Sequence, residues 1–128
     1  MRKARIWLEF AERDLERAKV MYSLGDYDDA AYHLQQAVEK SLKSVMVYFG
    51  ITPNVPKFKT HNIENLISVL EEGGINVPDW MYDAVLLTRY AFTTRYPDDY
   101  VPVSEEEYME AYDIALKVYE WARGVVQN

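Results

Sequence analysis

A long segment bracketed by Gly25 and Gly50 constrains the fold of this chain most strongly. Its apolar and small residues recur at the spacing of one helix face, so we expect a single central helix. Asp26 is a suitable N-cap because its short side chain accepts from the first-turn N–H groups. Gly50 suits the left-handed position after a helix, and Pro53 cannot continue one. The apolar face comprises Ala30, Leu34, Ala37, Val38, Ser41, Leu42, Val45 and Phe49.

The opposite face of this helix carries Asp29, Gln36, Lys40 and Lys43. On pattern alone it is the solvated side of a core helix. Gln36, Lys40 and Lys43 are also stacked at i, i+4 and i+7, which suits a face that binds an anion. The sequence is compatible with both a solvated face and an anion-binding face.

The rest of the chain also reads as helical. A first helix over 2–23 ends at a tight turn, so it should run antiparallel to the central one. Thr60 or Asn62 caps a third helix that closes at Gly73 and Gly74. The remaining elements are a helix from Pro78 to near Tyr96 and a helix from the capping box Ser104–Glu107 to about Val126. We therefore expect one all-α domain, residues 1–128. It should be an up-and-down bundle of about five helices, three long and two shorter.

Asp14 lies by angle on the apolar stripe of the first helix, between Trp7 and Ala18. An acid there is costly to bury unless it is paired. One interpretation is an edge position whose carboxylate reaches water. The other is a buried ion pair with a cation, or a contact with Tyr or His, from another helix.

Composition excludes several classes of protein. The net charge is −7, with 10 Lys+Arg against 8 Asp+Glu in residues 1–60 and 4 against 13 beyond them. A monomer that binds a long nucleic-acid backbone by charge alone is therefore not expected, but this charge distribution is compatible with a local basic site for a phosphate-bearing ligand or an RNA end. The chain has no cysteine, no span of about 18 apolar residues and no signal peptide, so we expect a cytoplasmic protein without a membrane segment.

Few residues suit catalysis. The two histidines, His33 and His61, stand in no metal-binding register, and we expect neither a metal nor a cofactor. Lys57, Lys59, Thr60 and His61 precede the third helix, whose N-terminal N–H groups favour an anion. Arg95 and Tyr96 follow at the end of the fourth.

Four stretches of this sequence together resemble the HEPN family, the nucleotide-binding domain shared by higher eukaryotes and prokaryotes. The matching stretches are AERDLERAK, GDYDDAAYHLQQAVEKSLKSVMVYFG, KTHNIENL and TRYPDD, in that order along nearly the whole chain. The resemblance implies a helical bundle that commonly forms a homodimer. It also implies a small prokaryotic protein that often pairs with a minimal nucleotidyltransferase in toxin–antitoxin-like modules.

Some HEPN proteins are metal-independent ribonucleases, recognised by an Arg followed four to six residues later by a His. This chain departs from that pattern, because no histidine follows His61. In that chemistry His carries the proton and Arg stabilises the phosphate charge. The usual mechanism therefore lacks its central group, unless His61 lies beside Arg95.

We accordingly expect a non-catalytic HEPN protein that binds a nucleotide, a minimal nucleotidyltransferase partner, or both. The alternatives are a ribonuclease with a non-standard active site and a purely structural interaction module. An excess of large aromatic residues favours a homodimer. The candidate nucleotide or phosphate contacts are Lys40, Lys43, Lys59, His61, Arg95 and Tyr96.

Overall fold

The computed structural model describes residues 2–51, 62–91 and 101–127. Within them lie five elements, which are α1 (Arg2–Ser23), α2 (Tyr27–Tyr48), α3 (Ile63–Glu72), the 3₁₀ helix η2 (Asp79–Tyr90) and α4 (Glu105–Gln127). The described residues contain no strand. The predicted all-α bundle, with three long helices and two shorter ones, is confirmed.

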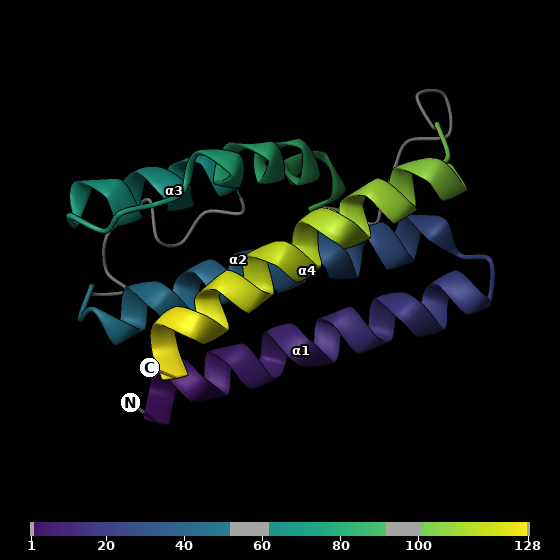
Figure 1. The fold of residues 1–128 in the computed structure, drawn as a ribbon. Helices are drawn as coiled ribbons and strands as arrows, with labels where there is room; N and C mark the ends of the chain where they lie inside the picture. Colours follow the sequence, from purple (N-terminus) through teal and green to yellow (C-terminus); the bar gives the residue numbers. More distant parts are fainter. Residues whose placement is uncertain (1, 52–61, 92–100, 128) are drawn as a thin grey trace.

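Helix α2 is the centre of the bundle and packs against α1, α3, η2 and α4. α1 and α2 run antiparallel, since the Ser44 hydroxyl near the end of α2 donates to the Ala4 carbonyl near the start of α1, at 2.6 Å. Figure 1 shows α4 returning alongside them, so that both chain termini lie at one end, while α3 and η2 cover one side of α2. The Tyr119 hydroxyl of α4 donates to the Glu12 carboxylate of α1 at 2.8 Å.

Local signals in the sequence fix most helix ends. The Asp26 carboxylate accepts from the backbone N–H three residues on, at 3.0 Å, as an N-cap does. Asn62, the second of the two candidates for the next cap, does the same for α3 at 3.3 Å. Ser104 and Glu107 bond reciprocally at 3.1 and 3.2 Å, which completes the predicted capping box. Gly50 adopts φ +76°, the left-handed conformation expected after α2.

The segment after Pro78 differs from the prediction of an α-helix reaching Tyr96. It forms a 3₁₀ helix from Asp79 to Tyr90, and residues 92–100 lie outside the described part of the chain. The physical reason is the spacing of its buried residues, which recur every third position, as a 3₁₀ helix with three residues per turn requires. These residues are Met81, Ala84, Leu87 and Tyr90.

Helix α2 buries two polar residues that the sequence prediction assigned to neither its apolar nor its polar face. Gln35 is 0% and Glu39 4% exposed, because α2 is surrounded by the other helices. Phe49, predicted on the apolar face, is 52% exposed just beyond the end of α2. A central helix therefore buries polar residues that a single apolar stripe does not identify.

Candidate functional site

The Asp14 carboxylate is the buried centre of a charged cluster between α1 and α2. It is 1% exposed. The Lys40 Nζ lies 2.6 Å from Asp14 Oδ2, and the His33 Nδ1 lies 2.8 Å from Asp14 Oδ1. The Arg17 guanidinium, one turn along α1, is 3.6 Å away. This arrangement agrees with the second interpretation of Asp14, a buried ion pair. Donors from both helices compensate the negative charge of the carboxylate.

His33 links this cluster to a second carboxylate. Its Nε2 lies 3.4 Å from Asp29 Oδ2, and its ring meets the edge of Tyr32 at a centroid distance of 5.3 Å. In the neutral imidazole that carries its proton on Nδ1, this N–H group donates to Asp14. In the imidazolium, both ring nitrogens carry a proton and both donate. The candidate ligand contacts predicted from the sequence do not include His33, although a His of another helix is among the partners expected for Asp14. The spacing of His33, four residues from Asp29 and seven from Lys40, already places the three side chains on one helix face.

Lys43 belongs to a neighbouring network rather than to the Asp14 cluster. Its Nζ donates to the buried Glu39 carboxylate at 2.8 Å, and Gln35 donates to the other oxygen of Glu39 at 3.1 Å. The ammonium also lies 5.7 Å from the centre of the Trp7 ring. Both lysines predicted to face an anion thus face carboxylates of this same chain.

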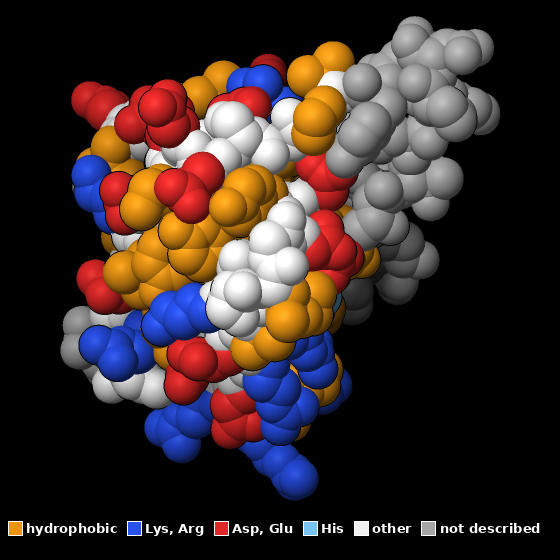
Figure 2. All heavy atoms as spheres, turned by 90° about the vertical axis from the view of Figure 1, so that its right-hand side faces the viewer, with side chains coloured by type: hydrophobic (Ala, Val, Ile, Leu, Met, Phe, Trp, Pro, Cys, Tyr) orange, Lys and Arg blue, Asp and Glu red, His pale blue; other side chains and the backbone are white. Residues whose placement is uncertain are grey.

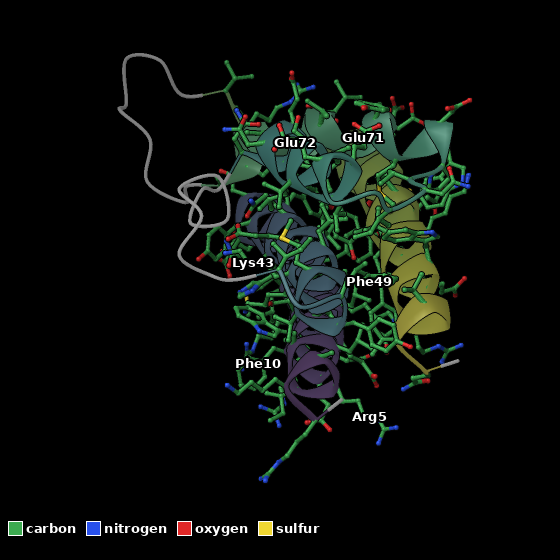
Figure 3. The ribbon with its side chains drawn as sticks, turned by 90° about the vertical axis from the view of Figure 1, so that its left-hand side faces the viewer. Arg5, Phe10, Lys43, Phe49, Glu71 and Glu72 are labelled. Carbon is green, nitrogen blue, oxygen red and sulfur yellow. The ribbon has the colours of Figure 1, made fainter. Side chains whose placement is uncertain are left out.

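Above Asp14, a surface hollow of about 210 Å³ is lined by Phe10, Arg13, Arg17 and Lys40. The Phe10 ring is 40% exposed. The Arg13 guanidinium lies 5.2 Å and the Lys40 Nζ 6.0 Å from the centre of this ring. We call this feature the cationic hollow. Figure 3 shows Phe10 on the same edge of the α1–α2 pair as Lys43. Two cations beside an exposed aromatic ring, with a third lining the same hollow, suit an anionic ligand that also carries an apolar group.

Two other hollows are less suited to an anion. One of about 430 Å³ lies along the outer face of α1, where Glu9, Glu12 and Glu16 outnumber the two arginines that this hollow shares with the cationic hollow. Another of about 50 Å³ lies between η2 and α4, with Glu107 and Glu110 at its rim. Figure 2 shows Lys and Arg side chains gathering at the lower edge of the molecule, the side of α1. The local charge therefore favours the cationic hollow as the site for an anionic ligand.

The structure places only part of the predicted ligand set. Lys40 lines the cationic hollow and Lys43 lies in the adjoining Glu39 network. The other four predicted contacts, Lys59, His61, Arg95 and Tyr96, lie outside the described residues. Sequence reasoning missed Phe10, Arg13 and Arg17, although their spacing of three and four residues places them on adjoining turns of α1.

Two features of the described residues bear on the class of protein. No group of three or more His, Cys, Asp or Glu side chains within them is arranged to hold a metal ion. None of the helices described has the length and apolar character needed to cross a membrane.

The fold defines an all-α bundle whose long central helix lies between an N-terminal and a C-terminal helix, with a charged cluster between the first two. The family model of the HEPN domain matches residues 4–125, nearly the whole chain. The chain belongs to the HEPN family, as its sequence motifs predict.

Solved structures support the same assignment. The protein TT1696 from Thermus thermophilus is 32% identical, with a TM-score of 0.81 over 98% of this chain and 99% of that one. ST0689, described as an archaeal HEPN homologue, is 28% identical, with a TM-score of 0.74 over 96% of this chain and 97% of that one. Both are similar along their full length.

A curated relative carries a functional name. The Methanocaldococcus jannaschii protein named "Putative toxin MJ1304" is 46% identical over 48 residues, which are 38% of this chain. The match spans about a third, 32%, of that protein's length.

Proposed function

We propose that this protein is a non-catalytic HEPN component of a toxin–antitoxin-like module and binds a nucleotide or an RNA end in the cationic hollow. The observation that carries the proposal is the convergence of Arg13, Arg17 and Lys40 from two helices at one hollow, with the exposed ring of Phe10 beside Arg13 and Lys40. Guanidinium and ammonium groups hold phosphate by charge-assisted hydrogen bonds, and the ring packs against the sugar or base.

The remaining predicted contacts extend this proposal. Lys43, with its ammonium over Trp7, continues the basic and aromatic character of the α1–α2 surface. Lys59, His61, Arg95 and Tyr96 stay proposed ligand contacts. The similarity to a protein named as a putative toxin supports the module, in which a minimal nucleotidyltransferase is the proposed partner. We also propose a homodimer, in keeping with exposed apolar side chains such as Phe49 and Leu86.

Titration of AMP into the purified protein, followed by calorimetry, tests the proposal. The double variant Arg13→Ala/Arg17→Ala removes two of the three cations at exposed side chains, while the buried Asp14 carboxylate keeps its closer contacts with Lys40 and His33. Losing even one charge-assisted bond, worth about 1.5–3 kcal/mol, weakens binding by about tenfold or more. The matched control is Arg5→Ala, an exposed arginine of the same helix that does not line the hollow. Equal affinity in the double variant and the control contradicts the proposed site.

One observation favours a second candidate, a metal-independent ribonuclease with a non-standard active site. His33 lies between Asp14 and Asp29 and shares Asp14 with Lys40, so a proton carrier adjoins a phosphate-binding cation. Incubation of pure protein and a His33→Gln variant with RNA and a chelator separates the two candidates. RNA cleavage that disappears in His33→Gln, or in Arg95→Ala, establishes the ribonuclease.

A further inference from the structure

We infer that the cationic hollow selects a terminal phosphate monoester over an internal phosphodiester. This inference rests on the proposed function and names the ligand group that the site takes. A terminal phosphate carries between about −1.5 and −2 charges near pH 7 and presents three acceptor oxygens. A diester carries a single negative charge.

The first argument is the local charge balance. Arg13, Arg17 and Lys40 supply three positive charges at the hollow, and the Asp14 carboxylate beneath them supplies one negative charge. The cations therefore outnumber the one buried carboxylate that they face, while Glu9, Glu12 and Glu16 lie beside the same two arginines on the outer face of α1. A dianion compensates more of the positive charge on the inner side of the hollow than a monoanionic diester does.

The second argument is competition with Asp14. The Lys40 ammonium already lies 2.6 Å from this carboxylate, and Arg17 lies 3.6 Å from it. A ligand phosphate must draw both cations partly away from a fixed internal anion. At equal distance, a dianion gains about twice the Coulomb attraction of a monoanion. Asp14 therefore acts as an internal competitor that a monoester overcomes more readily than a diester.

The third argument is size and donor geometry. A hollow of about 210 Å³ is smaller than the roughly 300–1,000 Å³ of pockets that enclose a drug-sized ligand. It accommodates a phosphate and the adjoining sugar, with Phe10 as the apolar wall. The two arginines present forked donors and Lys40 a point charge, a set that matches three terminal oxygens better than the two of a diester.

Adenosine 5′-monophosphate and adenosine 3′,5′-cyclic monophosphate test the inference, because they share a base but differ in phosphate class. Calorimetry at fixed ionic strength should give affinity at least about tenfold tighter for the monoester. The preference should disappear in Arg13→Ala/Arg17→Ala and persist in Arg5→Ala. A second comparison uses a short single-stranded RNA with a 5′-phosphate and the same RNA with a 5′-hydroxyl group. It tests whether the hollow binds the terminal phosphate of an RNA as well as that of a free nucleotide.

The outcomes separate this inference from the function on which it rests. If the two adenosine ligands bind equally and the double variant binds neither, the monoester selectivity is contradicted but the proposed phosphate site is still supported. Failure of both ligands to bind the wild type overturns the proposed site and the inference together. A monoester preference in either the nucleotide or the RNA pair, abolished by the double variant, supports the inference and identifies its source.

Discussion

Lys40 and Asp14, 26 residues apart in the chain, are joined by a 2.6 Å contact between the Lys40 ammonium and a carboxylate that is 1% exposed. This pair ties α1 to α2, and its Lys40 lines the cationic hollow. The same contact therefore connects the stability of the α1–α2 pair to the proposed ligand site. Removing one partner of such a pair leaves the other charge buried or poorly solvated.

We predict that Asp14→Ala lowers the free energy of unfolding by about 3 kcal/mol, because Lys40 and His33 lose the carboxylate that compensates them. Urea denaturation monitored by circular dichroism measures the loss. The control Glu9→Ala, an exposed acid on the same helix, should stay within about 0.5 kcal/mol of the wild type. A cost of only a few tenths for Asp14→Ala would show that the pair contributes little to the fold.

The capping box at the start of α4 gives a second prediction. Ser104→Ala should cost about 1 kcal/mol, because the Glu107 N–H loses its acceptor. Ser23→Ala is the control, since the Ser23 hydroxyl bonds a carbonyl at the end of α1 and caps no N–H group. Thermal unfolding of both variants measures the difference, and equal melting temperatures would be inconsistent with a stabilising cap.

Glu107 adds a pH dependence to this cap. The backbone N–H of Ser104 donates to its carboxylate and holds the pKa of Glu107 below its ordinary value. A lowered folded-state pKa means that the stabilisation is present above the ordinary value and is lost as the pH falls through the folded-state value. The contribution of Glu107 should therefore disappear in acid, and Glu107→Gln should flatten that part of the stability profile.

Tyrosines in the core predict a loss of stability in alkali. Burial, together with the hydrogen bond to Glu12, raises the pKa of Tyr119 to about 12, and burial raises the pKa of Tyr108 to about 12. Because the fold favours the neutral phenol, this stabilisation is present below the ordinary tyrosine pKa of about 10. It is lost as the pH rises toward about 12. Ultraviolet titration of the folded protein should show a late class of phenols, from which Tyr119→Phe removes one. Uniform ionisation near the ordinary pKa in the native state would contradict this.

The homodimer is tested by sedimentation. At micromolar concentration, we expect a species of twice the chain mass, because exposed apolar side chains remain on the closed bundle. Figure 2 shows such side chains forming a patch between acidic ones at one end of the molecule. A monomer throughout the concentration range would contradict the dimer.

The sequence predicts those features of the fold that depend on local chemistry. Ser104 and Glu107 define the start of α4, and Asp26 that of α2, because a cap needs only residues three positions apart. The helix predicted after Pro78 is a 3₁₀ helix rather than an α-helix from Asp79 to Tyr90, where the buried residues recur at every third position. The three-residue spacing from Met81 to Tyr90 was present in the sequence.

The candidate site was only partly predictable for a different reason. Periodicity places Asp14 on the inner stripe of α1, but it does not give the rotation of α2 against α1. That rotation decides whether Lys40 and His33 meet Asp14. For the same reason the sequence did not single out Phe10, Arg13 and Arg17, which join Lys40 at one hollow only after the two helices pack.

Mapping AMP onto the protein tests the central claim most directly. Backbone amide chemical shifts recorded during an AMP titration should change most around Phe10, Arg13 and Arg17 of α1 and around Lys40 of α2. The changes should saturate with the affinity measured by calorimetry and vanish in Arg13→Ala/Arg17→Ala. Saturable changes that leave this part of α1 and α2 unaffected, or no changes at all, would contradict a phosphate site in the cationic hollow.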